Sequence, residues 1–340
     1  MFKVLLIDFV KILNMKKAKL NLKETQYAIE ILKDTFSKKL RKSLNLIRVS
    51  APLFVRSTSG LNDGLSGEKP VSFQPISINE SLEIVHSLAK WKRDALHRYN
   101  FELYHGIYTD MNAIRQQETI DNTHSFYVDQ WDWEMIIDNK DRSISFLKKI
   151  VNKIYKSLKY TEYKINKIYS SLVSKLPKKV FFISSLDLYN RFPNLNAEQR
   201  EYELVKEHGA IFIYQIGNLL PSGLPHSKRA KDYDDWQLNG DLIVYDKNND
   251  IALELSSMGI RVNSESLIKQ YNMDKTEITK ISPYHKAVIE NKLPLTIGGG
   301  IGQSRIAMFL LEKKHIGEVQ VSVWDDKTIQ NAKNSEIILL

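Results

Sequence analysis

The sequence predicts a single α+β domain with a mixed, mainly antiparallel sheet flanked by helices. Two long segments, 23–44 and 143–176, have the apolar periodicity of amphipathic helices. Short β segments recur between and after them, and most are separated by loops or single helices. No internal repeat or low-complexity linker divides the chain, so we expect residues 15–340 to form one domain.

The two predicted helices carry apolar residues at three- and four-residue spacing, which places those residues on one helix face. In the first helix they are Ile29, Leu32, Phe36, Leu40 and Leu44. In the second helix they are Phe146, Ile150, Ile154 and Leu158. Each stripe therefore predicts a long helix with one buried face.

The predicted strands are short runs rich in β-branched and aromatic residues. "LIRVSAPLF" at 46–54 predicts a strand with Pro52 near its end. "HSFYVDQWDWEMII" at 124–137 predicts a strand with interleaved aromatic and acidic residues, whose Trp131 and Trp133 we assign to the core. Further β segments lie at 180–184, 210–217, 241–246, 251–262 and 319–324.

The composition is that of a globular protein, with 43% hydrophobic and 26% charged residues. The net charge is +9, but only 12 of the 49 basic residues are arginine and the lysines are spread widely. This pattern favours a solvated lysine-rich surface, and we do not expect nucleic acid as a partner. The absence of cysteine excludes disulfides, thiolate zinc sites and a cysteine nucleophile, and it fits a reducing compartment. We therefore expect a cytoplasmic protein.

The N-terminal segment resembles a signal peptide only briefly. Asp8 and Lys11 interrupt its apolar part, and no small-residue cleavage site follows. Residues 1–14 are interpreted as an extension or a misassigned start, with Met15 preferred as the first residue. No apolar run in the sequence reaches the length of a membrane span, so a membrane is not an expected partner.

The stretch "TIGGGIGQSRIAMFLL" at 296–311 holds four of the 14 glycines. It matches neither a P-loop nor a dinucleotide-binding fingerprint. Gly298, Gly300 and Gly302 alternate, so on a strand they share one face without side chains. A flat ligand such as an adenine ring lying on this face, with Arg305 at its edge, is one interpretation. A glycine-rich bend between strand and helix is the other.

Three segments in order carry a resemblance to a known fold. They are "LNLIRVSAPLF", then "AIRQQE" followed by "HSFYVDQWDWE", and finally "GGGIGQSRIAMFL". Together they resemble motifs 1, 2 and 3 of the class II aminoacyl-tRNA synthetase fold. The segments "HSLAKWKR", "DYDDW", "NGD" and "ELSSMGIRV" narrow the match, and the chain from about residue 22 to about 324 resembles ammonia-dependent asparagine synthetases.

The resemblance implies a single catalytic domain that makes L-asparagine from L-aspartate and ammonia. ATP is the expected cosubstrate, with Mg²⁺ on its phosphates, and β-aspartyl-AMP the expected intermediate. Arg115 matches the motif 2 arginine, which bridges the attacking carboxylate and the α-phosphate. Arg305 matches the motif 3 arginine, near the adenine and the γ-phosphate. Asp241 and Glu254 match the acid pair that holds Mg²⁺.

Aspartate must be held at both ends, and the resemblance implies candidates for each. The α-ammonium group has Asp63, Gln130 and Asp132 as candidates, and the α-carboxylate has Lys92. The further substrate contacts are Ser87, Ser257 and Asp234. A carboxylate must also deprotonate ammonium, and Asp63 and Asp234 both remain open for that role. The expected catalytic residues are Arg115, Asp63, Gln130 and Arg305.

The nucleotide side of the expected site includes the alternating glycines as a floor under the adenosine. Its full expected set is His86, Ser125, Arg229, Gly298, Gly300, Gly302 and Arg305. For His86 a packed structural role is an equal alternative. Arg229 and Asp234 are expected to close a lid over ATP.

The family resemblance also implies a homodimer, because motif 1 packs against its copy across a two-fold axis. Two alternatives remain. An aspartyl- or asparaginyl-tRNA synthetase would carry a separate anticodon-binding domain, but only 43 residues precede Leu44 and they read as helix. A non-catalytic paralogue would bind an amino acid or nucleotide, and the presence of Arg115, Asp241, Glu254 and Arg305 argues against it.

Overall fold

The structure, a computed structural model, describes residues 19–65 and 67–340. The expected extension at 1–14 and the start at Met15 fall outside these residues. Eight strands form the central sheet in the order β1-β5-β6-β11-β10-β9-β8-β7. Their bounds are β1 Leu46–Arg48, β5 Gly106–Ile114, β6 Tyr127–Ile136, β7 Phe181–Ser184, β8 Ala210–Tyr214, β9 Asp234–Asp246, β10 Ile251–Arg261 and β11 Thr296–Gly302.

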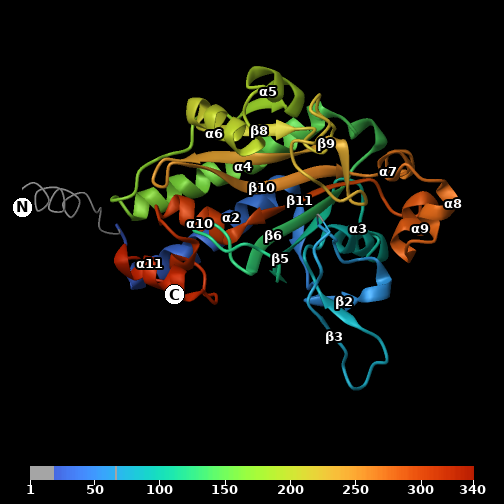
Figure 1. Ribbon diagram of the computed structural model, residues 1–340, viewed down its shortest axis with the longest axis horizontal. Helices are drawn as coiled ribbons and strands as arrows, with labels where there is room; N and C mark the ends of the chain where they lie inside the picture. Colours follow the sequence, from blue (N-terminus) through green and yellow to red (C-terminus); the bar gives the residue numbers. More distant parts are fainter. Residues whose placement is uncertain (1–18, 66) are drawn as a thin grey trace, which may run out of the picture.

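The predicted mixed, mainly antiparallel sheet is confirmed. The inner strands pair in antiparallel fashion, and parallel pairs occur only at the two edges, between β1 and β5 and between β7 and β8. The long strands β6, β11, β10 and β9 lie side by side in the middle of the sheet (Figure 1). These strands form the floor on which the candidate site is built.

Two long helices, α2 (Leu22–Leu44) and α4 (Ile144–Ile168), pack together along one face of the sheet (Figure 1). The helix α2 starts with a capping box between Asn21 and Glu24 and ends at Asn45 in the left-handed conformation. Its apolar stripe is buried against α4 and against the indoles of Trp131 and Trp133. The period-2 alternation of β6 thus sends its aromatic residues to this core and its polar residues to the opposite face.

Of the remaining elements, the helix α10 (Gln303–Leu310) shares the core of α2 and α4, and the others lie around the rest of the sheet. The small sheet has the order β2-β4-β3 and projects from the body as an arm beside α3 (Figure 1). Its strands are β2 Phe54–Arg56, β3 Ser72–Phe73 and β4 Leu82–Ile84. The other helices are α3 Ala89–Arg98, α5 Ser185–Arg191, α6 Ala197–His208, α7 Ser264–Tyr271, α8 Lys275–Thr279, α9 Pro283–Ile289, α10 Gln303–Leu310 and α11 Asp326–Asn334.

Three sequence predictions differ from the structure. The segment 46–54 is not one strand, because β1 ends at Arg48 and the chain passes through Pro52, which lacks an N–H, before β2 begins in the small sheet. The second long helix ends at Ile168, since Glu162 accepts hydrogen bonds from the backbone N–H groups of Lys175 and Leu176 and folds the chain back.

The segment 319–324 forms no strand, because its valines at 321 and 323 lie exposed and none of the described strands pairs with it. The strand β5, which the sequence did not predict, fills the place between β1 and β6. Within residues 19–65 and 67–340, no helix combines the length and the apolar character that crossing a membrane requires.

Candidate active site

A cavity of about 340 Å³ lies on the polar face of the sheet, above β6, β10 and β11. Most residues assigned to the site from the sequence line it. They are Asp63, Ser87, Lys92, Arg115, Ser125, Gln130, Asp132, Arg229, Asp234, Glu254, Ser257, Gly300, Gly302 and Arg305. Residues that are distant in the sequence therefore gather around one space.

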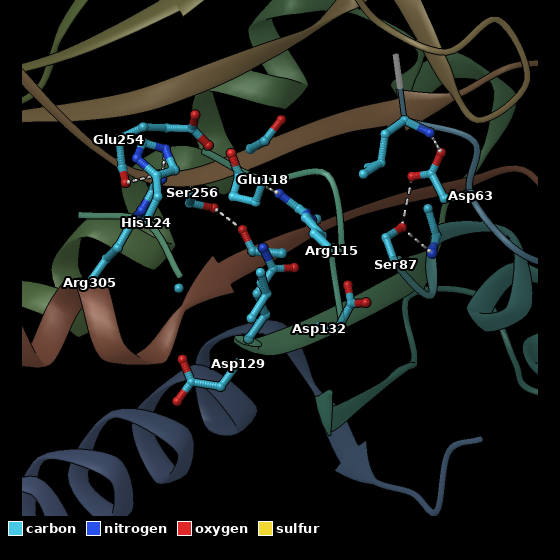
Figure 2. Close-up of a pocket in the computed structure, with 18 of the residues that line it drawn as sticks. Asp63, Ser87, Arg115, Glu118, His124, Asp129, Asp132, Glu254, Ser256 and Arg305 are labelled. Carbon is cyan, nitrogen blue, oxygen red and sulfur yellow. Dashed lines mark hydrogen bonds and ion pairs between the residues drawn. The ribbon is translucent and has the colours of Figure 1, made fainter. Parts of the chain in front are cut away.

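The cavity has two chemically different ends, which Figure 2 shows. Asp63 and Ser87 lie at one end, whereas Arg305 and Glu254 lie at the other. Arg115, the residue that follows β5, lies between the two ends of the cavity. The first end is rich in carboxylates, and the second presents an arginine beside bare glycine backbone.

The first end rests on a network of buried charges. Lys92 pairs with Asp132, and its Nζ lies 3.8 Å from Glu134 Oε2. Arg261 Nη2 donates to Glu134 Oε2 over 2.7 Å, and Arg261 Nη1 pairs with Asp234. All five side chains are almost completely buried. Burial lowers the pKa of Lys92, and the attraction of the Asp132 and Glu134 carboxylates offsets only part of that effect.

Asp63 is held by neutral donors instead of an arginine. Its Oδ2 accepts a hydrogen bond of 2.9 Å from Ser87 Oγ, and its Oδ1 accepts one of 2.8 Å from the backbone N–H of Leu65. Burial raises the pKa of Asp63, whereas the nearby Lys90 ammonium group opposes that rise. The side chain is therefore a carboxylate that can take up a proton more readily than an exposed aspartate.

The second end is organised by Arg305, the third residue of α10. Its Nη1 donates to the carbonyl of Glu254 over 3.0 Å, and its Nη2 lies 2.8 Å from His124 Nε2. Arg115 is less constrained, since its Nη1 lies 3.9 Å from Glu118 Oε2. The Nε of Arg115 is buried and has no hydrogen-bond partner among the described residues. The guanidinium of Arg115 thus retains capacity to bind an anion.

The alternating glycines have more than one role. A Cβ on Gly298 would lie 2.5 Å from Glu134 Cδ and 2.6 Å from Arg261 Nη2. A Cβ on Gly300 would lie 2.7 Å from Gln130 Cδ. These two glycines therefore make room for polar side chains that lean over β11. Gly298 does not line the cavity, whereas Gly302 lines it at the second end, where the side chain of Arg305 lies beside it.

Asp241 and His86 also lie outside the cavity lining. Asp241 is paired with Arg229 behind the cavity wall, and its Oδ1 has no hydrogen-bond partner in the described chain. Burial raises the pKa of Asp241 to about 7, with Glu254 adding to the rise and Arg229 opposing it. His86 is fully buried and its Nδ1 lies 3.2 Å from the carbonyl oxygen of Asp63, which supports the structural alternative for this residue.

Several residues of the site were not assigned from the sequence. The most informative are Glu134, Arg261, Tyr233, Glu118 and His124. Glu134 had a signal, because it occupies the next alternate position after Gln130 and Asp132 on one strand. Arg261 is 127 residues away from Glu134, and only the sheet register brings the two together.

Known proteins with a similar fold include aminoacyl-tRNA synthetases. The chain superimposes on asparaginyl-tRNA synthetase from Pyrococcus horikoshii, complexed with asparaginyl-adenylate, with a TM-score of 0.63 and 15% identity, over 87% of this chain and 68% of that one. It also superimposes on aspartyl-tRNA synthetase from Entamoeba histolytica with a TM-score of 0.58 and 14% identity, over 89% and 59% of the two chains. The fold is that of a class II synthetase catalytic domain.

Sequence relatives give a narrower result. The chain is 54% identical to an aspartate–ammonia ligase from Clostridium perfringens, over 95% of this chain and 97% of the relative. It is 49% identical to an aspartate–ammonia ligase from Pediococcus pentosaceus, again over 95% of this chain and 97% of the relative. Residues 23–336 match the family described as aspartate-ammonia ligase. With nearly the whole chain matched, this protein belongs to the aspartate–ammonia ligase family.

Proposed function

We propose that this chain makes L-asparagine from L-aspartate and ammonia, using ATP and releasing AMP and pyrophosphate. The observation that carries the proposal is the position of Arg115 between a carboxylate-rich end and an arginine–glycine end of one cavity (Figure 2). The first end suits an amino acid, and the second suits a nucleotide. A guanidinium between them lies where a carboxylate and a phosphate have to meet.

In the first step an oxygen of the aspartate side-chain carboxylate attacks the α-phosphorus of ATP, and pyrophosphate leaves. Lys92 holds the α-carboxylate of aspartate, while Asp63, Gln130 and Asp132 hold its α-ammonium group. Arg115 bridges the two anions and stabilises the charge that develops on phosphorus. The product is β-aspartyl-AMP. The residues on either side act by orienting the two reactants.

In the second step ammonia attacks the β-carbonyl carbon, AMP leaves as the C–O bond breaks, and the nitrogen gives up a second proton to the departing phosphate as the amide is formed. Ammonium must first lose a proton to a carboxylate. We infer that Asp63 accepts this proton, because Asp234 is already paired with Arg261 whereas Asp63 is held by neutral donors. Ser257 and Ser87 contribute hydrogen bonds to the substrate at this end.

At the nucleotide end, Arg305 contacts the adenine and the terminal phosphate, and Gly302 gives the ring a surface without side chains. Ser125, Gly300 and Arg229 complete this side of the site. Arg229, together with Asp234, belongs to the segment that covers bound ATP.

The residues present fit a magnesium ion on the ATP phosphates. Glu254 lines the cavity, and its charge helps to raise the pKa of Asp241, which is paired with Arg229 behind the wall and whose Oδ1 is buried without a partner among the residues described. The described residues contain no group of three side chains that could bind a metal ion together. Phosphate oxygens and water would therefore supply most of the ligands, which is common for Mg²⁺. When bound, the ion would neutralise phosphate charge.

The proposed assembly is a homodimer formed through the motif 1 region. β1 is an edge strand of the large sheet, so its outer side has no neighbouring strand in the described chain. Apolar side chains of α2 and of the segment 46–54 are 45% to 54% exposed: Tyr27, Ile47, Leu53 and Phe54. A second copy would cover them, and a monomeric mass by light scattering at micromolar concentration would contradict the dimer. We also propose a cytoplasmic location, with no nucleic acid or membrane as partner.

The deciding experiment is aspartate-dependent exchange of pyrophosphate into ATP, followed by addition of ammonium or of tRNA. Exchange followed by asparagine and AMP formation with ammonium is the expected result. ADP and phosphate as products would contradict the adenylation route. Transfer to tRNA would favour a synthetase, and no exchange at all would favour a non-catalytic paralogue.

A further inference from the structure

A second buried charge cluster lies behind the aspartate end of the cavity. Lys90, on α3, donates to Asp232 Oδ2 over 2.7 Å, and both side chains are almost fully buried. His285, on α9, has its Nε2 3.4 Å from the same carboxylate oxygen. Its ring is fixed by Tyr271 Oη at 2.9 Å from Nε2 and by Ser282 Oγ at 2.7 Å from Nδ1. None of these five residues lines the cavity.

This cluster contacts the cavity wall from two directions. Asp232 immediately precedes Tyr233 and Asp234, which both line the cavity. The loop that leads to Asp63 passes Gly60, whose φ of 69° lies in the left-handed region and where a Cβ would overlap Ser282 at the start of α9. The helices α7 to α9 therefore support the loop that carries Asp63.

The charges of the cluster also act on Asp63 itself. The ammonium group of Lys90 lowers the pKa of Asp63 against the larger effect of burial, whereas the carboxylate of Asp232 raises it. Burial would raise the pKa of Asp232 too, but His285 and Lys90 hold it at about 2, so this carboxylate stays charged. Lys90 is thus a buried cation that pairs with Asp232 and whose charge also acts on Asp63.

We propose that Lys90 is a positioning residue for the aspartate end of the site: its ammonium group, held by Asp232 and backed by His285, balances the charge of Asp63 beside the substrate. The inference rests on the proposed function, in which Asp63 acts in its ionised form. Lys92, two positions along α3, points into the cavity, whereas Lys90 acts from behind the wall.

The proposal predicts opposite effects for the two members of the pair. The titratable groups His86 and Tyr233 also interact with Asp63, and both variants leave those unchanged. Lys90→Met removes the cation, so Asp63 should protonate at higher pH. Asp232→Asn removes a repelling carboxylate of the same shape, so Asp63 should protonate at lower pH. Damage to packing alone would not reverse sign between the variants.

The test is the dissociation constant for aspartate, measured by titration calorimetry between about pH 5 and 8. The acid limb is the part of this pH profile where aspartate affinity falls because Asp63 becomes protonated. In Lys90→Met the acid limb should move to higher pH by about one unit, so that aspartate binds about tenfold more weakly at the acid end. Lys90→Arg, which keeps the charge, should restore most of the affinity. In Asp232→Asn the limb should move down. Lys175→Met, which breaks a comparable buried pair with Glu312 away from the cavity, is the matched control and should leave the limb in place.

Limbs that move in the same direction, or that do not move, would overturn the inference, and so would a Lys175→Met enzyme that behaves like Lys90→Met. If Lys90→Met fails to fold, the direction of the shift in Asp232→Asn decides alone. The binding readout also separates the two proposals. A wild-type protein that binds aspartate but forms no asparagine would contradict the proposed function, while the opposite shifts would still support the role of Lys90. A wild-type protein that does not bind aspartate would overturn both.

Discussion

Replacing Gly298 by alanine should damage both stability and the aspartate end of the site. Glu134 on β6 and Arg261 on β10 belong to strands separated by β11, and their side chains meet across Gly298. A methyl group there would lie 2.5 Å from Glu134 Cδ and 2.6 Å from Arg261 Nη2. Carbon atoms pack at about 3.5 Å or more, so the carboxylate would have to retreat by about 1 Å.

That retreat has a large energetic consequence because the pair is buried. Arg261 Nη2 and Nε donate to Glu134 over 2.7 Å and 2.9 Å, and a shift of about 1 Å carries both contacts beyond hydrogen-bond length. Breaking a buried ion pair costs about 3–5 kcal/mol. Relaxation of neighbouring side chains would recover some of this, so we expect a loss of about 3 kcal/mol in the free energy of unfolding.

The assay is denaturant unfolding together with steady-state kinetics, and Gly302→Ala is the matched control. In Gly302 the nearest side-chain atom to a new Cβ is Arg305 Cβ at 3.3 Å, which requires movement of only a few tenths of an ångström. The Gly298 variant should also raise the KM for aspartate more than that for ATP, because Glu134 and Arg261 support Lys92 and Asp234. A Gly298→Ala protein within about 0.5 kcal/mol of wild type would refute this reasoning.

Three further predictions concern charged residues of the proposed site. Arg115→Lys keeps the charge but loses the planar fork, so kcat should fall about a hundredfold with little change in either KM; a near-normal kcat would show that Arg115 is misassigned. Arg305→Lys should instead raise the KM for ATP at least as much as it lowers kcat, and the same kinetic series checks this. Because the pKa of Lys92 is lowered and its cationic form binds the α-carboxylate, kcat/KM for aspartate should fall as pH rises through that lowered pKa; a profile that stays flat up to the ordinary lysine pKa of 10.5 would argue against this role.

The sequence predicted the fold well where periodicity is long and uninterrupted. The apolar stripe of α2 and the alternation of β6 each extend over several repeats, so each pattern is long enough to distinguish a helix from a strand. Predictions of secondary structure were weaker for short segments. The valines near residue 321 alternate as in a strand, but strand formation depends on a neighbour that the sequence cannot display, and none is present in the described chain.

The site was predictable to the extent that a residue falls within a recognisable motif. Arg115 and Arg305 belong to motifs, and both line the cavity. Lys90 lies in the same "KWKR" segment as Lys92, yet the sequence does not say which lysine enters the cavity, because helix orientation depends on packing against the sheet. Arg261 was part of a quoted motif without an assigned role, since its partner Glu134 becomes its neighbour only through the order of β6, β11 and β10.

The alternating glycines of β11 combine two requirements that the sequence presents as one pattern. At Gly298 and Gly300 the missing side chains let polar groups cross over the strand, so charged Glu134 and Arg261 fill the first position and the neutral amide of Gln130 fills the second. At Gly302 the neighbouring group is the side chain of Arg305 itself, and both residues line the cavity. One strand therefore supports a buried ion-pair network at its start and places Gly302 beside Arg305 at its end. The change from Gly298 to Gly302 along β11 matches the change from the proposed amino-acid end to the proposed nucleotide end of the cavity. It gives a physical reason why the two ends lie side by side on one sheet.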